Sequence, residues 1–299
     1  MLVQGTRCRF QGSYVALPTP FRNGQIDYGD FARLIEWHIA SGTDGLVIAG
    51  TTGEAATLSE PERAGLFAAA VAITRRRVPI IGGVGTNCTR TTLEAAQGAV
   101  QAGVDGLLVV TPYYNKPGRR GQVLHFSAVA QACRIPIVLY NVPGRTGIDM
   151  SVEAVQELGA SHPHIVAIKE AKPDLDKVRR LVQETQVAVL CGEDAAIADF
   201  MGLGAVGVIG VVANLVPAKT AELVRAALPG GDHVRAAQLV EELAPLARDL
   251  FIEANPVPVK TALAKMGRLS AEVRLPLCEM EPSTLAQLES TLRRAQLIG

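Results

Sequence analysis

The sequence has few cysteines, no excess charge of either sign and no long apolar run, and each shortage excludes a class of protein. Its five cysteines are widely spaced and never form a C-x-x-C pair, which argues against a disulfide framework and against a zinc site. Lysine plus arginine and aspartate plus glutamate both number 29, so the chain lacks the basic surface that binds nucleic acids or anionic membranes. No apolar run approaches the roughly 18 residues of a membrane span, and residues 1–12 lack the apolar stretch of a signal peptide. We therefore expect a cytoplasmic protein with reduced, mostly buried cysteines and small-molecule partners.

The chain alternates between two patterns along most of its length. Its 299 residues are 48% hydrophobic, which is enough for one α/β barrel or for two ordinary domains. Short apolar segments predict eight strands, at residues 13–17, 45–49, 78–82, 106–110, 136–140, 164–168, 187–191 and 206–209. Amphipathic segments predict helices between and after them, at residues 28–41, 60–75, 91–102, 121–132, 151–159, 174–184 and 217–228. Eight such units of buried parallel strands predict an α/β fold, the (β/α)₈ TIM barrel.

The residues beyond the eighth unit have a different pattern. Helical periodicity continues at residues 233–251, 256–266 and 282–296, with no strand between these segments. No linker rich in glycine, serine or proline separates them from the barrel. We therefore expect a catalytic barrel domain at residues 1–230 and a C-terminal helical region at residues 231–299 that packs on the barrel.

Lys169 ends the apolar segment 165–168, where a lysine is unusual. An ammonium at the edge of an apolar core costs free energy unless it is paired or loses its proton. Loss of the proton is also what a lysine that forms a Schiff base requires. The alternative is a lysine that only extends its amine from a strand end into water.

Polar residues follow three other predicted strands. They are the hydroxyls of residues 50–54, the two tyrosines of residues 111–117 and the arginine of residues 141–147, which Tyr140 precedes. The C-terminal ends of barrel strands form one rim, so these groups and Lys169 are expected to converge. An amine attacks a carbonyl, a phenol relays protons, hydroxyls bind a carboxylate, and an arginine binds a second carboxylate. This set predicts an imine-forming enzyme that acts on oxo acids.

Each of these segments also has a structural interpretation. Residues 50–54 are consistent with a tight turn, Tyr113 and Tyr114 with an aromatic interface patch, and Arg145 with an exposed loop cation. The placement of all of them after successive strands favours one site. Two other motifs are interpreted as structural: residues 202–207 match a dinucleotide-binding string but run into a strand, and residues 255–260 bring a second lysine beyond the barrel.

Four segments in order resemble the dihydrodipicolinate synthase and N-acetylneuraminate lyase family, and the resemblance covers essentially the full length. They are GTTGE at 50–54, YNVPGRTG at 140–147, KEA at 169–171 and NPVPVK at 255–260. The resemblance implies a (β/α)₈ barrel with a C-terminal helical region, usually assembled as a homotetramer built as a dimer of dimers. It also implies an imine between pyruvate and a lysine that matches Lys169, with no metal or organic cofactor.

The resemblance assigns catalytic roles to four residues. Lys169 matches the nucleophile. Tyr140, Thr51 and Tyr114 match a proton relay of two tyrosines bridged by a threonine, and Tyr114 is expected to reach into the site of the neighbouring subunit.

It assigns substrate binding to four more. Thr52 matches the residue that holds the pyruvate carboxylate, and Gly53 follows it in the same segment. Arg145 matches the arginine that binds the carboxylate of aspartate semialdehyde, which the sialic-acid lyases lack. Ile209 matches the residue whose backbone carbonyl lines the pocket.

The leading hypothesis is therefore a condensation of pyruvate with aspartate semialdehyde. A retro-aldol lyase or dehydratase would use the same lysine on a longer 2-oxo acid, such as sialic acid or a 2-keto-3-deoxy sugar acid. A third hypothesis, from another class, is a barrel that binds a small molecule without catalysis, and the joint presence of the lysine, the tyrosines and the threonine disfavours it.

One departure from the family predicts the response to lysine. Feedback-inhibited members bind lysine with an acidic residue and a histidine at positions that Thr91 and Arg63 occupy here, although Asn87, Ala56 and Tyr113 do match. The missing carboxylate removes the partner of the inhibitor's ammonium, and Arg63 adds a like charge. We expect millimolar lysine to leave turnover nearly unchanged in a steady-state assay, and strong suppression would contradict this prediction.

Overall fold

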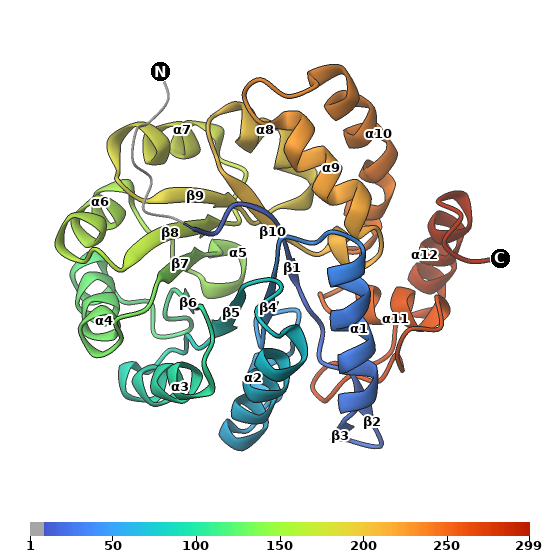
Figure 1. Ribbon diagram of the computed structural model, residues 1–299, viewed down its shortest axis with the longest axis horizontal. Helices are drawn as coiled ribbons and strands as arrows, with labels where there is room; N and C mark the ends of the chain where they lie inside the picture. The colour runs from blue at the N-terminus through green and yellow to red at the C-terminus, as the bar shows by residue number, and fades with distance from the viewer. Residues whose placement is uncertain (1–8) are drawn as a thin grey trace.

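A closed barrel of eight parallel strands forms the centre of the computed structural model, which describes residues 9–299 (Figure 1). The strands are β1 (Gly12–Ala16), β4 (Gly45–Ile48), β5 (Ile80–Gly83), β6 (Gly106–Val110), β7 (Ile137–Asn141), β8 (Ile165–Glu170), β9 (Ala188–Cys191) and β10 (Gly207–Gly210). Each strand pairs with the next, and β1 pairs with β10 to close the ring. The predicted (β/α)₈ TIM barrel with a C-terminal helical extension is confirmed.

A ring of helices surrounds the strands (Figure 1). It comprises α1 (Tyr28–Ala40), α2 (Glu60–Thr74), α3 (Thr89–Ala102), α4 (Arg119–Ala132), α6 (Val152–Ser161), α7 (Leu175–Glu184), α8 (Ile197–Gly202) and α9 (Pro217–Ala227). Helix α2 begins with a capping box, in which the Ser59 N–H donates to the Glu62 carboxylate at 2.9 Å and the Ser59 hydroxyl accepts from the Glu62 N–H. The periodic pattern missed α8, the short helix α5 (Pro143–Thr146) and the hairpin β2 (Phe21–Arg22) and β3 (Gln25–Ile26), since none is long enough to repeat the pattern.

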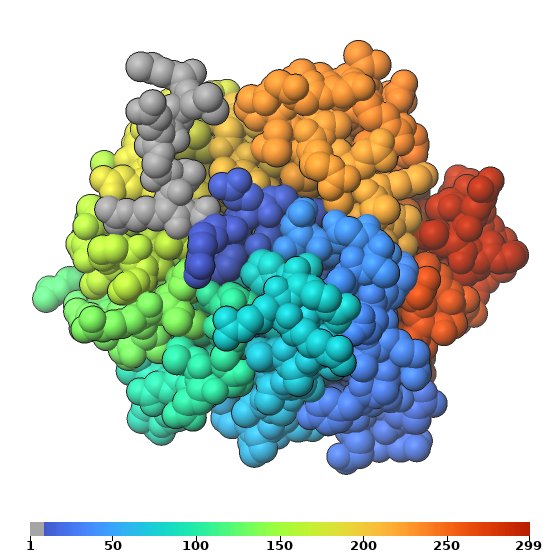
Figure 2. All heavy atoms as spheres, viewed as in Figure 1, coloured from blue at the N-terminus to red at the C-terminus, as the bar shows by residue number. Residues whose placement is uncertain are grey.

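The alternation of side chains along each strand separates two apolar cores. On β7, Val138 and Tyr140 point into the barrel, whereas Leu139 packs between the barrel and the helices. The N-terminal end of the barrel is filled by Phe10 and Tyr14, whose rings meet edge to face at 6.0 Å. In the space-filling view, the start of the described chain, in dark blue, lies across the centre of this face (Figure 2). A ligand therefore has to enter from the opposite end.

Three helices follow the barrel: α10 (His233–Asp249), α11 (Val257–Lys265) and α12 (Pro282–Arg294). Helix α10 packs on α9 and on α12, and α11 packs on α12 at one edge of the molecule (Figures 1 and 2). One of the contacts between this C-terminal region and the barrel is an ion pair with no solvent exposure, in which Lys260 of α11 lies 2.6 Å from Glu54 of the β4–α2 loop. The boundary at residue 230 stays a prediction.

Three expectations from the sequence concern membrane helices, metal ligands and cysteines. Within residues 9–299, no helix is long and apolar enough to cross a membrane, and no three His, Cys, Asp or Glu side chains are grouped as metal ligands would be. Cys133 and Cys191 are buried free thiols, but Cys88 and Cys278 are exposed, so the expectation of mostly buried cysteines is wrong for these two. Both lie in irregular segments between helices and strands, where the side chain is not covered. Cys8 lies outside the described residues.

The buried ion pair predicts how the C-terminal helices respond to substitution. Lys260→Met leaves the Glu54 carboxylate buried without its ammonium and should lower the free energy of unfolding by about 3–5 kcal/mol. Lys265→Met, on the same helix, removes a lysine that is 43% exposed and paired with Glu289, and should have little effect. Urea unfolding followed by circular dichroism measures both, and equal losses for the two variants would contradict the prediction.

Candidate active site

A cavity of about 180 Å³ opens at the C-terminal end of the barrel strands. The residues that line it lie on or directly after strands of the barrel, among them the ends of β7 and β8, or come from the connection between α10 and α11. The polar ones are Thr51, Thr52, Tyr140, Arg145, Lys169, Glu193 and Asn255. Three of the four segments that the sequence placed on one rim therefore share one cavity, whereas Tyr113 of the fourth lines a second cavity.

Lys169 lies at the end of β8 and points into the barrel. Its side chain is buried, and its Nζ lies 4.4 Å from the centre of the Tyr140 ring. No other residue between 9 and 299 forms an ion pair or a hydrogen bond with this amine. Gly192 leaves room for it, since a Cβ there would stand 2.9 Å from Lys169 Cε. No bond within the described chain has to break before the amine reaches a ligand in the cavity.

Tyr140 lies beside Lys169 on the inner face of the barrel, because the two residues are register partners on the neighbouring strands β7 and β8. The tyrosine is buried and lines both this cavity and a second one of about 240 Å³ beside it. Thr51 also lines both cavities. A phenol and a hydroxyl thus border the space that the amine faces, which is the arrangement that proton transfer to and from a bound carbonyl compound needs.

Asn255 joins two of the predicted binding residues. Its amide Nδ2 donates to the Thr52 hydroxyl at 3.0 Å, and its backbone carbonyl accepts from Arg145 Nη2 at 3.3 Å. Arg145 sits on the single turn of α5, immediately after β7. A segment beyond the barrel therefore holds both a hydroxyl of the β4 loop and the guanidinium of the β7 loop at the cavity wall.

Two carboxylates follow β9 on the same rim. Burial raises the pKa of Glu193, which lines the cavity, and the negative charge of Asp194 raises it further. Burial also raises the pKa of Asp194, although its Oδ2 accepts from the backbone N–H groups of Val211 and Val212 at 2.8 and 3.2 Å. Asp194 thereby anchors the turn after β10, and Glu193 adds an acidic group to the wall near Lys169.

Three predicted site residues do not line this cavity. Tyr114 is 89% exposed with a backbone φ of 72°. Gly53 is buried, and its carbonyl accepts from the Thr19 hydroxyl at 2.7 Å. Ile209 is buried in the barrel core on β10. Their assigned roles stay predictions.

The sequence analysis missed Glu193, Asn255 and Phe251 as cavity residues. Glu193 follows the predicted strand 187–191, so the rule that found the other segments also applied to it. Asn255 and Phe251 gave no such signal, because their place at the rim depends on how the C-terminal helices pack. Residues 255–260 nevertheless stood out as a motif, and Asn255 is its first member.

Comparisons with known proteins give a consistent result. The model of the dihydrodipicolinate synthetase family matches residues 9–295. The chain is similar to the 4-hydroxy-tetrahydrodipicolinate synthase of Oleidesulfovibrio alaskensis, with 44% identity over 97% of this chain and 100% of that protein. Its fold is similar to the crystal structure of dihydrodipicolinate synthase from Aquifex aeolicus, with a TM-score of 0.95, 43% identity, and coverage of 96% of this chain and 99% of that one. It is also similar to the Cyanidioschyzon merolae enzyme crystallised with lysine bound, with a TM-score of 0.94, 35% identity, and coverage of 97% and 99%.

Proposed function

This chain belongs to the dihydrodipicolinate synthetase family, and we propose that it is a 4-hydroxy-tetrahydrodipicolinate synthase. Such an enzyme is a lyase that condenses pyruvate with L-aspartate 4-semialdehyde in the diaminopimelate route to lysine. The observation that carries the proposal is the buried amine of Lys169, which has no ionic or hydrogen-bonding partner among residues 9–299 and lies against the Tyr140 ring.

The proposed reaction begins at Lys169. Its amine adds to the C2 carbonyl of pyruvate, and loss of water leaves an iminium ion. Removal of a proton from C3 gives an enamine, whose carbon then adds to the aldehyde of the second substrate. Cyclisation through the amine of that substrate displaces Lys169 and restores the enzyme. The iminium itself accepts the electron pair, so the reaction requires no metal or organic cofactor.

Proton transfer is assigned to hydroxyl groups around the amine. Tyr140 serves as the proton donor and acceptor during imine formation, and Thr51 links it to Tyr114 of the partner subunit. Tyr114 projects from its own subunit with a positive φ, a strained conformation for a residue with a side chain. These features support a homotetramer in which each tyrosine completes a neighbouring site.

Two carboxylates have to be bound during the reaction. The Thr52 hydroxyl, which Asn255 orients, and the adjoining Gly53 segment hold the carboxylate of pyruvate, and the Ile209 carbonyl contributes to the pocket floor. Arg145 binds the carboxylate of aspartate semialdehyde, since this residue lines the cavity and is exposed to solvent, where an incoming substrate can reach it. Binding both substrates beside the amine makes their union effectively intramolecular.

Borohydride trapping tests the imine. Incubation with pyruvate and borohydride should add one reduced pyruvyl group to Lys169, located by peptide mass spectrometry. Lys169→Ala should remove the adduct, whereas Lys265→Met, which changes a surface lysine, should retain it. No adduct on the unmodified protein would refute the proposed function.

Condensation should also be faster than cleavage of sialic acid or 2-keto-3-deoxy sugar acids, and the reverse order would favour a lyase of the same family.

Arg145→Ala tests the choice of second substrate. The variant loses a charged hydrogen-bond donor and should lower kcat/KM for aspartate semialdehyde by about 10- to 100-fold, as expected from about 1.5–3 kcal/mol for such a bond. Trapping of the pyruvate adduct should be unchanged, because the arginine acts after the imine forms. Arg119→Ala, which removes a surface arginine paired with Glu157, provides the control. Loss of trapping in Arg145→Ala would show that the arginine serves the first substrate instead.

A further inference from the structure

Asn141 and Glu170 form a second pair directly behind Tyr140 and Lys169. The register of β7 and β8 places Tyr140 opposite Lys169 and, one residue on, Asn141 opposite Glu170. Successive residues of a strand point to opposite faces, so the first pair faces the cavity and the second faces the surrounding helices. We infer that Asn141 and Glu170 are positioning residues that hold the amine of Lys169 and the ring of Tyr140 in reactive alignment. The inference rests on the imine chemistry proposed above.

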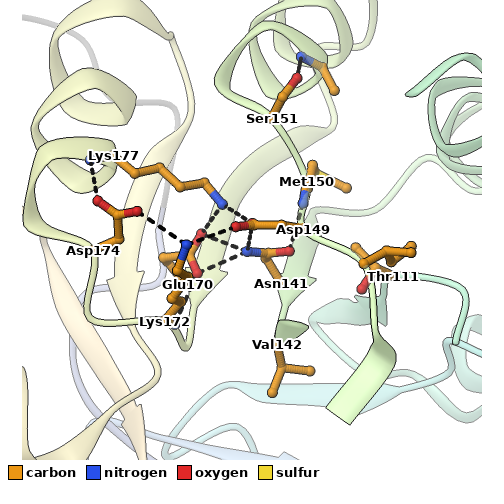
Figure 3. A network of polar contacts seen from close by, with 12 residues as sticks. Thr111, Asn141, Val142, Asp149, Met150, Ser151, Glu170, Lys172, Asp174 and Lys177 are labelled. Atoms are coloured by element: carbon orange, nitrogen blue, oxygen red, sulfur yellow. Dashed lines mark hydrogen bonds and ion pairs between the residues drawn. The ribbon is translucent and has the colours of Figure 1, made fainter. Parts of the chain in front are cut away.

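The Glu170 carboxylate has no solvent exposure, and each group of the described chain that bonds to it is a donor. Asn141 Nδ2 donates to both of its oxygens at 2.9 Å, and the Lys172 backbone N–H donates to Oε1 at 3.0 Å. Lys177 extends its ammonium from α7 to within 2.9 Å of Oε2 (Figure 3). Burial raises the pKa of Glu170, and the positive charge of Lys177 opposes that rise. An ionised carboxylate satisfies all of these donors at once, whereas an amide does not.

The Asn141 side chain also uses both its oxygen and its nitrogen in hydrogen bonds. Its Oδ1 accepts from the Met150 N–H at 2.9 Å, and its Nδ2 donates to Asp149 as well as to Glu170 (Figure 3). A side-chain amide with all its hydrogen bonds made has one orientation only. The ends of β7 and β8 are therefore fixed relative to one another by side chains in addition to the backbone ladder.

The same network holds the two loops that continue from these strands. Asp149 and Met150 close the loop that carries Arg145, and Lys172 closes the loop that begins with Ala171, a residue of the cavity wall. The Ala171 N–H also donates to the Asn141 carbonyl at 2.9 Å. A shift of Glu170 would thus move the strand end that carries Lys169 and both neighbouring loops together.

This geometry separates a positioning role from a merely stabilising one. Loss of stability lowers the number of folded sites but leaves each remaining site as fast as before. Loss of alignment slows every site, because a displacement of about 1 Å in a reacting group costs up to about 100-fold in rate. Borohydride quenching after increasing times with saturating pyruvate measures both quantities: the final amount of adduct counts competent sites, and the rate constant reports alignment.

Glu170→Gln replaces one carboxylate oxygen with an NH₂ group, which cannot accept from the three donors that surround it. This variant should slow adduct formation by about 10- to 100-fold, with the final amount of adduct retained. Asp105→Asn is the matched control. Its carboxylate accepts from the Ile80 N–H at 2.8 Å and so also joins neighbouring strands, but at the opposite end of the barrel. It should leave the rate constant and the final amount unchanged. Asn141→Ser, which keeps Glu170 paired with Lys177, should slow adduct formation as well and replaces Glu170→Gln if that variant does not fold.

An unchanged rate constant per competent site in the folded variants, whatever their stability, would overturn the inference. An equal slowing in Asp105→Asn would overturn it too, because the effect would then not depend on the end of the barrel that carries the site. Failure of the unmodified enzyme to form any adduct would instead refute the proposed function, so the two failures are distinguishable.

Discussion

The structure depends on one constraint: a primary amine has to sit in an apolar barrel, within reach of a substrate, without being captured by an acid. Lys169 meets this constraint because β8 delivers it to the C-terminal rim, where the apolar core ends and the Tyr140 ring covers it. Glu193 lines the same cavity, but no ion pair joins it to the amine in the described structure. Two other acids belong to other contacts. Glu170 points to the far side of the same strand and pairs with Lys177, while Asp194 is bound by backbone N–H groups. The amine therefore forms no ion pair with any described residue and can attack the carbonyl of a substrate.

A second constraint is that the site is assembled from loops, which are the least ordered parts of a barrel. Two buried ionic clusters hold these loops in place. The Glu170 cluster fixes the loops after β7 and β8, and the Lys260–Glu54 pair fixes the loop after β4, which carries Thr51 and Thr52. Asn255 then bridges from the C-terminal helices to Thr52 and Arg145. The helices beyond the barrel are therefore part of the site's support, and their removal would leave both a charge and a binding hydroxyl without partners.

Much of this was predictable from the sequence, and the exceptions share one cause. The strands, the main helices and the position of Lys169 follow from local periodicity and from the rule that polar residues gather at C-terminal strand ends. Asn255 was not predictable as a wall residue, because no local pattern says which rim a later helix reaches. Nor was the burial of Lys260, whose sequence context resembles that of any helical lysine. Its partner, Glu54, lies far away in the chain, and only tertiary packing brings the two together.

The two faces of a barrel strand explain why catalytic and supporting residues are adjacent in this sequence. Period-2 alternation means that the residue after an inward catalytic group points outward, toward the helices. Tyr140 is followed by Asn141, and Lys169 by Glu170, so each reactive group has a structural neighbour one residue later. A polar residue in that position is costly unless its partners are also buried, and here each outward residue is the partner of the other. The pairing of the outward residues thus makes the register of the inward residues unique, since a slip of one residue would bury the carboxylate in the barrel and expel the amine.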